Sequence, residues 1–291
     1  MNPPARCPPY SLKNPMPDSV VNDRPIEILR PDFPRGEFKA AMFDFDGTLS
    51  LIRRNWQAVM IPMMIDVLAE TGTGETRDQL HAHVEEFVMR LNGKQTIFQM
   101  IHLAEQVKER GGQAREPLEY KHQYHDLLWE QISHRVDGLK DGSIEPDELT
   151  VPGSRRLLEQ LQARGVTLYL ASGTDLKYVQ DEVKALELDH FFGPHIYGAL
   201  DNYNSFSKAM IIDRILADMK VSGHQLLAFG DGYVEIEETR KNGGVAVGVA
   251  SEEETRQGIN EWKRNRLISA GADIIIGDYS CQDELLKELG L

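Results

Sequence analysis

The chain has 291 residues, of which 41% are hydrophobic and 27% charged, and these proportions are typical of a globular protein with one large domain or two moderate ones. Its formal net charge of −14 argues against a nucleic-acid partner or an acidic membrane surface, although a bound divalent cation would still allow a phosphorylated substrate. Cys7 and Cys281 lie at opposite ends without metal-type spacing, and the chain has neither a membrane-spanning apolar run nor the apolar stretch of a signal peptide, so we expect a soluble cytoplasmic protein.

The first segment, residues 1–36, contains nine of the fourteen prolines and has neither helical nor strand periodicity. This composition predicts an extended N-terminal arm. A strand is expected next, from about Phe38 to Asp44, because a run of apolar residues leads into the aspartate.

Two carboxylates follow this strand, within the sequence Asp44-Phe45-Asp46-Gly47-Thr48. Residues at i and i+2 of a strand share a face, so Asp44 and Asp46 can reach one small volume. A buried pair of this kind needs a cation to neutralise it or a proton on one member. Gly47 and Thr48 add a tight turn, a close backbone approach and a hydroxyl group. The alternative is an ordinary Asp-Gly turn at the end of a strand.

The stretch from about residue 56 to residue 144 carries apolar residues at helical spacing, punctuated by glycines at 72–74 and 111–112. This pattern predicts roughly four amphipathic helices with no strand among them. The helical stretch directly follows the first carboxylate pair, so it separates that pair from the rest of the chain.

Strands and helices alternate from residue 151 onward. Strands are expected at 166–170, 195–197, 226–229, 245–249 and 274–276, and helices at 154–164, 177–186, 208–219 and 235–242. Near-continuous apolar strands that alternate with helices indicate a parallel sheet. The expected fold class is therefore α/β, a doubly wound parallel sheet with an inserted α-helical cap. We expect an arm over 1–36, a core over 37–52 and 150–291, and the cap over 53–149.

Ligands of a doubly wound sheet bind beyond the carboxyl ends of its strands, so the residues after each expected strand are candidates for a site. Ser172, Gly173 and Thr174 follow the strand at 166–170. Their hydroxyls and backbone N–H groups, at the expected start of a helix, suit a phosphate group. The alternative for these three residues is a simple helix N-cap.

Further charged residues reach the same edge. Asp231 follows the strand at 226–229, Glu235 comes one helical turn later, and Lys208 begins a helix of its own. Taken singly, Asp231 could belong to a turn and Lys208 to the solvated surface. Their placement after successive strands, on the edge that also receives Asp44 and Asp46, favours a functional site.

In type, order and approximate spacing, these residues resemble the four motifs of the haloacid dehalogenase superfamily. The motifs correspond, in order, to Asp44-Phe45-Asp46-Gly47-Thr48, Ser172, Lys208 and Gly230-Asp231-Gly232-Tyr233-Val234-Glu235. The resemblance covers the core at about 37–50 and 150–280. The helical insert is similar to the cap of phosphoglycolate-phosphatase-like and β-phosphoglucomutase-like members. Glu235 departs from the pattern, because many relatives carry Asp there, and direct contact with a metal stays open for this longer side chain.

The resemblance implies an aspartyl-phosphate mechanism. Asp44 would attack the phosphorus, and Asp46 would act first as general acid and then as general base. Mg²⁺ would be held by the Asp44 carboxylate, the Asp46 backbone carbonyl and Asp231, with Glu235 as a further candidate ligand.

The same resemblance implies that Ser172 and Lys208 bind the phosphoryl oxygens and offset their charge. We expect Thr48, Gly173 and Thr174, which supply hydroxyls and backbone N–H groups beside them, to contribute to substrate binding.

The expected cap offers further candidates for substrate contact. Arg53 and Arg54 lie just past the first motif, and Lys94 lies in a polar break at 92–96 where it could pair with a substrate anion. The alternative is that all three are solvated surface cations. His122 and His125 are three residues apart, and without a third ligand nearby we expect helix-surface histidines rather than metal ligands.

The expected function is Mg²⁺-dependent hydrolysis of a small phosphorylated metabolite, such as a sugar phosphate or phosphoglycolate. Dehalogenases and phosphonatase-like members of the superfamily lack the second aspartate, so Asp46 favours hydrolysis or transfer of a phosphate ester. A cap favours a small substrate over a phosphoprotein. The alternatives are a phosphomutase of the β-phosphoglucomutase type and a non-catalytic metabolite-binding regulatory module. No nucleic-acid or membrane partner is expected, and the sequence does not indicate the oligomeric state.

Overall fold

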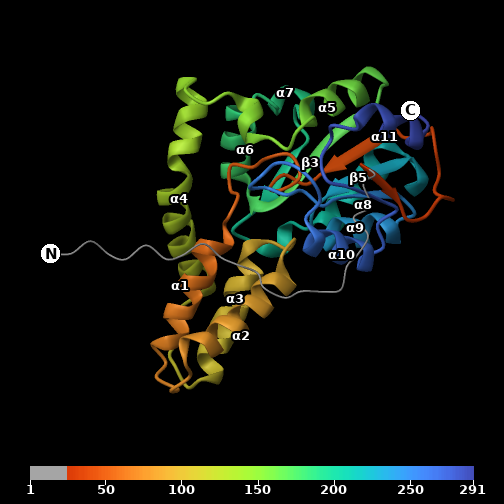
Figure 1. Cartoon of the computed structure of the whole chain (residues 1–291). Coiled ribbons are helices and arrows are strands. Elements are labelled where there is room, and N and C mark those ends of the chain that lie inside the picture. Colours follow the sequence, from red (N-terminus) through yellow and green to blue (C-terminus); the bar gives the residue numbers. More distant parts are fainter. Residues whose placement is uncertain (1–24) are drawn as a thin grey trace.

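The computed structural model describes residues 25–291, which form an α/β fold around a seven-stranded sheet (Figure 1). The strand order is β1-β7-β6-β5-β2-β3-β4, and the neighbours are parallel except for β1, which runs antiparallel to β7. The strands are β1 (Ile26–Ile28), β2 (Ala40–Phe43), β3 (Thr167–Asp175), β4 (Ile196–Ala199), β5 (Leu226–Gly230), β6 (Val245–Val249) and β7 (Ile274–Ile276). This architecture confirms the expected fold class.

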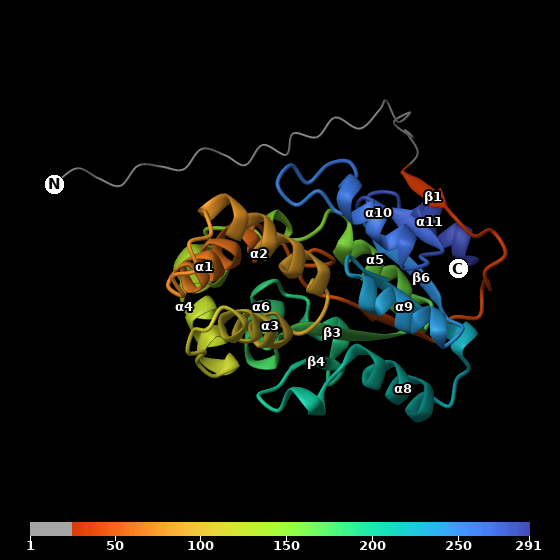
Figure 2. The same ribbon diagram turned by 90° about the horizontal axis from the view of Figure 1, so that it is seen from below.

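The central strand β2 is covered on both faces, because its side chains alternate between two layers of helices. Ala41 and Phe43 belong to the apolar cluster that includes residues of α5 (Ser154–Ala163), α6 (Leu176–Ala185), α7 (Asp189–Phe192) and α11 (Gln282–Leu289). Ala40 and Met42 belong to the cluster of α8 (Lys208–Met219). Helices α9 (Tyr233–Lys241) and α10 (Glu261–Ser269) cover β6 and β7 (Figure 2).

Four of the helices between β2 and β3 lie to one side of the sheet (Figure 1). They are α1 (Gln57–Ala69), α2 (Arg77–Leu91), α3 (Thr96–Glu109) and α4 (Pro117–Asp141). Their ends carry the expected signals: Thr76 and Gln79 form a capping box at the start of α2, Pro117 opens α4, and Gly142 ends it at a φ of 77°. Their apolar faces pack against one another, with α1 touching α2, α3 and α4, and α4 also contacts α6.

The order of strands reverses direction at β2, which lies between β3 on one side and β5 on the other. A crevice forms at such a switch point, beyond the carboxyl ends of the strands. The fold therefore directs the residues after β2, β3 and β5 toward one place.

The structure differs from the sequence prediction in several elements. Strand β1 lies within residues 1–36, where the sequence has no strand periodicity, because pairing with β7 and not a local pattern forms the strand. The strand expected at 166–170 continues to Asp175, so Ser172 and Thr174 extend β3 and do not open a helix. Helices α7, α10 and α11 were not predicted.

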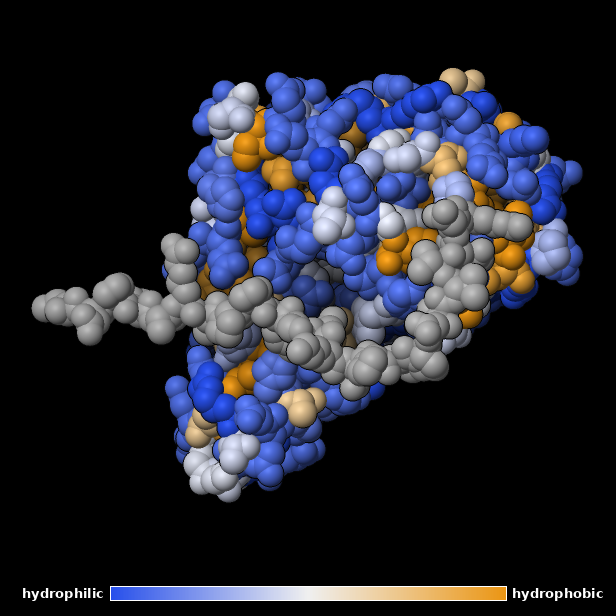
Figure 3. All heavy atoms as spheres, viewed as in Figure 1, coloured by the Kyte–Doolittle hydropathy of each residue, from blue (hydrophilic) through white to orange (hydrophobic). Residues whose placement is uncertain are grey.

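Residues 1–24, which hold Cys7 and most of the predicted arm, lie outside the described residues, whereas Cys281 is a free thiol. Hydrophilic residues predominate on the face shown in Figure 3. Within residues 25–291, no helix combines the length and the apolar character required to cross a bilayer.

Candidate active site

The carboxylate of Asp44 lies at the carboxyl end of β2 and is 7% exposed. The backbone N–H of Asp44 donates to the carbonyl of Phe229 at 2.9 Å, which continues the ladder between β2 and β5 by one residue. One carboxylate oxygen accepts from the Phe45 N–H at 2.8 Å. The sheet thus fixes the position of this side chain at the switch point.

The turn after Asp44 brings the loops after β2 and β5 into contact. Gly47 has a φ of 74°, and a Cβ atom there would collide with the carboxylate of Asp231, so glycine is required on both counts. The Thr48 hydroxyl oxygen accepts from the Asp231 N–H at 3.0 Å. Thr48 is fully buried and is not among the residues that line the cavity, and its hydroxyl holds the loop that carries Asp231.

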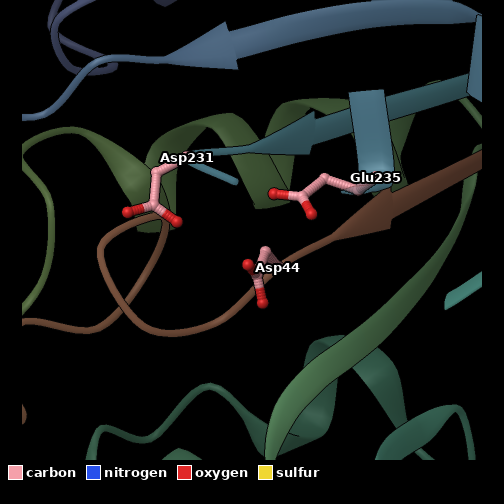
Figure 4. Close-up of side chains that lie close together, drawn as sticks. All are labelled: Asp44, Asp231 and Glu235. Atoms are coloured by element: carbon pink, nitrogen blue, oxygen red, sulfur yellow. The ribbon is translucent and has the colours of Figure 1, made fainter. Parts of the chain in front are cut away.

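Three carboxylates converge at this edge of the sheet. Asp44, Asp231 and Glu235 each present an oxygen, and these oxygens lie within 4.8 Å of one another (Figure 4). Burial raises the pKa of Asp44 well above its ordinary value, Lys208 opposes the rise, and the charges of Glu235 and Asp231 add to it. Oxygen donors of this kind, gathered from three carboxylates, fit a magnesium ion.

Lys208 is buried at the start of α8 and joins two of these carboxylates. Its ammonium nitrogen lies 2.6 Å from Oδ2 of Asp44 and 2.7 Å from Oε2 of Glu235. Although burial opposes the charged form, the two carboxylates hold the pKa of Lys208 above its ordinary value. This lysine is therefore a fixed cation beside Asp44.

Glu235 is fully buried in the first turn of α9 and has a partner on each oxygen. Oε1 accepts from the Gly232 N–H at 2.7 Å, and Oε2 accepts from Lys208. Glu235 therefore holds Lys208 and the loop after β5 in place.

Asp46 points into the same region from the turn after β2. Its Oδ2 atom accepts from the Thr174 hydroxyl at 2.8 Å, whereas its buried Oδ1 atom has no hydrogen-bond partner and lies 3.9 Å from the guanidinium of Arg53. Burial raises the pKa of Asp46 to about 6, with Arg53 and the Thr174 hydrogen bond opposing the rise and Glu182 adding to it. A carboxyl with a pKa in this range can both give and take a proton near neutral pH.

The end of β3 supplies the small polar residues opposite Asp44. The Ser172 hydroxyl oxygen accepts from the Thr174 N–H at 3.1 Å, and Ser172, Gly173 and Thr174 all line the cavity. They reach the site as an extended strand end, with α6 starting only at Leu176.

A cavity with a water-accessible volume of about 80 Å³ lies between this sheet edge and the helices α1–α4, with room for several water molecules. Its floor comes from the loops of the sheet and its opposite wall from the helical segment. The lining residues on that wall are Arg53, Trp56, Met60, Asn92, Gly93, Lys94, Thr96, Gln99 and Tyr124.

Arg53 lines the cavity but is buried, so the alternative of a solvated surface cation is wrong for this residue. Its guanidinium makes a bidentate ion pair with Glu182 of α6, with Nη2 at 2.6 Å and Nε at 3.0 Å from the carboxylate. Burial opposes the charge of Arg53, but Glu182 and Asp46 raise its pKa. Lys94, in contrast, is exposed at the cavity and has no carboxylate within 4.0 Å among the described residues.

Sequence reasoning missed Lys263, which reaches the acidic cluster from α10. Its buried ammonium nitrogen lies 2.9 Å from Oδ2 of Asp231, 2.6 Å from Glu253 and 3.0 Å from the Ser251 hydroxyl. The Ser251 hydroxyl in turn donates to the Gly47 carbonyl at 2.5 Å. No motif marks Lys263, and only the packing of α10 against β6 and β7 brings it to the site.

The histidines of α4 correct another expectation. His125 is buried, not on the helix surface, because α4 packs against α6 and the ring lies 4.9 Å from the ring of Tyr178. Its Nε2 atom lies 3.6 Å from Asp175, which also forms an ion pair with the buried Lys121. His122 is exposed, as expected.

Comparison with known protein families gives one match. The sequence model of a family described as haloacid dehalogenase-like hydrolase matches residues 38–243, which is more than half of the chain. No curated protein sequence matches.

Solved structures share the fold at low sequence identity. One is a predicted phosphoglycolate phosphatase from Haemophilus somnus, with 17% identity and a TM-score of 0.57 over 86% of this chain and 98% of that chain. Another is a haloacid dehalogenase-like protein of unknown function from Agrobacterium tumefaciens, with 18% identity and a TM-score of 0.56 over 87% of this chain and 100% of that chain. A third is a predicted phosphatase from Clostridium acetobutylicum, with 16% identity and a TM-score of 0.55 over 87% of this chain and 99% of that chain.

Proposed function

Because this chain belongs to the haloacid dehalogenase-like hydrolases, we propose that it is a magnesium-dependent phosphatase that hydrolyses a small phosphorylated metabolite through an aspartyl-phosphate intermediate. The observation that carries the proposal is the position of Asp44. Its carboxylate lies at the switch point of the sheet, beside the fixed cation Lys208 and two residues from a carboxyl, Asp46, that is held by Thr174.

In this proposal Asp44 is the nucleophile and Asp46 is the general acid and base. A carboxylate oxygen of Asp44 attacks the phosphorus, the bond from phosphorus to the leaving oxygen breaks, and Asp46 donates its proton to that oxygen. Asp46 then takes a proton from the water that attacks the aspartyl-phosphate, and inorganic phosphate leaves as the Asp44 carboxylate is restored. The pKa of about 6 for Asp46 supports both proton transfers.

The remaining site residues would bind the phosphoryl group and offset its negative charge. Ser172 and the backbone of Gly173 would bind phosphoryl oxygens, and Lys208 would hold Asp44 and the transferred group. Mg²⁺ held by the carboxylates of Asp44 and Asp231 and by the Asp46 backbone carbonyl would neutralise charge on the phosphoryl oxygens. The converging carboxylate oxygens support this ligand set.

We further propose the domain division that the sequence predicts, with residues 53–149 as a cap over a core of 37–52 and 150–291. The cavity between the helices α1–α4 and the sheet edge supports this division. Its place between these helices and the sheet edge supports a small metabolite substrate, with Lys94 and Arg53 on the leaving-group side. A cytoplasmic location, with no nucleic-acid or membrane partner, stays our prediction from the sequence.

The test is a panel of phosphorylated metabolites, including sugar phosphates and phosphoglycolate, with and without Mg²⁺. We expect Mg²⁺-dependent release of inorganic phosphate from a subset of the panel. Asp44→Asn should lower this rate by more than about 1,000-fold, because it removes the nucleophile. The matched control Asp213→Asn changes an exposed aspartate of α8 and should leave the rate unchanged.

Three other outcomes would contradict the proposal. An isomeric phosphate ester in place of inorganic phosphate would indicate a phosphomutase. Binding of a metabolite without turnover across the panel would indicate a regulatory module. Turnover by Asp44→Asn close to that of the unaltered protein would remove the assigned nucleophile.

A further inference from the structure

The wall of the cavity opposite Asp44 includes the segment that joins α2 to α3, residues 92–95, which we call the roof segment. Asn92, Gly93 and Lys94 line the cavity, as does Thr96 at the start of α3. The position of this segment therefore decides how closed the cavity is.

The roof segment touches two catalytic loops at glycines. A Cβ atom at Gly93 would lie 3.2 Å from the Cα atom of Gly232, in the loop after β5. A Cβ atom at Gly173, at the end of β3, would lie 2.8 Å from the carbonyl oxygen of Lys94. Backbone thus meets backbone at both contacts, and neither contact supplies a side chain to hold the segment in place.

The side chain of Arg266, on α10, holds the roof segment in place. Its guanidinium donates to the carbonyl of Met89, to that of Arg90 at 3.0 Å and to that of Asn92 at 2.9 Å. Helix α2 ends at Leu91, so these carbonyls belong to its last turn and to the first roof residue, where the regular i to i−4 bonding of the helix stops. A cation is also favoured at the negative end of a helix.

The same guanidinium contacts the catalytic loop through an aromatic ring. Its central carbon lies 4.8 Å from the ring centre of Tyr233 and 5.2 Å from that of Trp262. Tyr233 directly follows Gly232 and begins α9. Arg266 therefore connects the end of α2 to the loop that carries Asp231, and Lys263, one turn earlier on α10, holds the carboxylate of Asp231 itself.

We propose that Arg266 is a positioning residue that docks the roof segment over the catalytic cavity. This inference rests on the proposed phosphatase function for its kinetic readout. Gln95 anchors the far end of the segment, because its amide nitrogen donates to the carbonyls of Tyr203 and Phe206. Without Arg266, the end next to α2 loses these side-chain hydrogen bonds, and the cavity opens.

The experiment compares Arg266→Gln with the matched control Arg264→Gln. Arg264 lies on the same helix but pairs with Glu27 of β1 through two contacts of 2.7 Å. The substrate is the phosphate ester that the unaltered protein hydrolyses best. We expect Arg266→Gln to raise KM by about 10- to 100-fold, because two or more charge-assisted hydrogen bonds are lost. The value of kcat should stay within about threefold of that of the unaltered protein. Arg266→Lys, which keeps the cation, should raise KM less than Arg266→Gln does.

Hydrogen exchange of the substrate-free protein gives a second readout. We expect Arg266→Gln to speed exchange at the amides of Asn92 and Lys94, which donate to Met89 and Leu91, while the core strands exchange as before. A KM and an exchange pattern equal to those of Arg264→Gln would overturn the proposal. Faster exchange throughout the core would also overturn it, by showing a general structural role. If neither the unaltered protein nor any variant hydrolyses an ester, the proposed phosphatase function is wrong. Hydrogen exchange still tests whether Arg266 docks the roof segment.

Discussion

Three buried cations in the site each lie between two carboxylates: Lys208 between Asp44 and Glu235, Lys263 between Asp231 and Glu253, and Arg53 between Asp46 and Glu182. Buried charges are tolerated when they are paired and hydrogen-bonded, and removing one partner leaves an uncompensated charge. Because carboxylates outnumber cations, negative charge is left over for a divalent ion to neutralise. The cost of burying a charge also governs His125 of α4, whose charged form is disfavoured by burial.

Stability should fall in acid because of His125. Burial, aided by the charges of Arg53 and Lys121, lowers its pKa to about 3 from an ordinary value of 6.5. The unfolded chain therefore binds a proton between these values that the folded chain does not, so this histidine does not affect the pH dependence of stability well above pH 6.5 and destabilises the folded protein increasingly as the pH falls toward 3. At pH 5 this loss is about 2 kcal/mol of unfolding free energy relative to pH 7.

Urea unfolding at pH 7 and pH 5 measures this effect. His125→Phe should reduce the difference between the two pH values by about 2 kcal/mol, whereas His134→Gln, at an exposed position of the same helix, should leave it unchanged. An unaltered pH dependence in His125→Phe would show that other groups produce it.

At the scale of elements, the parts that the sequence predicts are those with a strong periodic signal. The central strands and the helices α1–α4, α5, α6, α8 and α9 all lie close to their expected positions. Strand β1 and helix α10 carry no such signal. Strand β1 has three residues and exists through its pairing with β7, and of the nine residues of α10 only Lys263 and Leu267 are buried.

Strand β1 should nevertheless contribute to stability, because it covers the edge of β7. Ile26 is 7% exposed and pairs with Ile276, so Ile26→Ala should cost about 2 kcal/mol of unfolding free energy. Ile28, on the same strand, is 37% exposed, and Ile28→Ala should cost less than about 0.5 kcal/mol. Urea unfolding of both variants tests this, and equal costs would contradict the assigned packing.

At the scale of the whole molecule, the sheet gathers residues that lie far apart in sequence. Asp44, Ser172, Lys208 and Asp231 could be predicted to meet, because parallel strands bring their carboxyl ends to one edge. The partners of these residues could not be predicted. Lys263 and Glu182 are ordinary surface-type residues in sequence, and their burial depends on how α10 and α6 pack.

The contacts of the helical segment α1–α4 could likewise not be predicted from the sequence. Its existence follows from periodicity, but the contact between the roof segment and the catalytic loops depends on glycine approaches and on Arg266, which no local pattern marks. The burial of His125 likewise follows from the packing of α4 on α6 and not from its spacing to His122.

The central claim is that Asp44 becomes covalently phosphorylated in a site that needs a divalent ion. The most direct measurement is to acid-quench the protein during turnover of a phosphate ester with Mg²⁺ and to locate, by peptide mass mapping, the mass increment of one phosphoryl group. The account predicts that increment on the peptide with Asp44, and its loss in Asp44→Asn or when the ion is chelated. A phosphorylated residue elsewhere in the chain would contradict it, as would steady turnover with no phosphorylated peptide at any quench time.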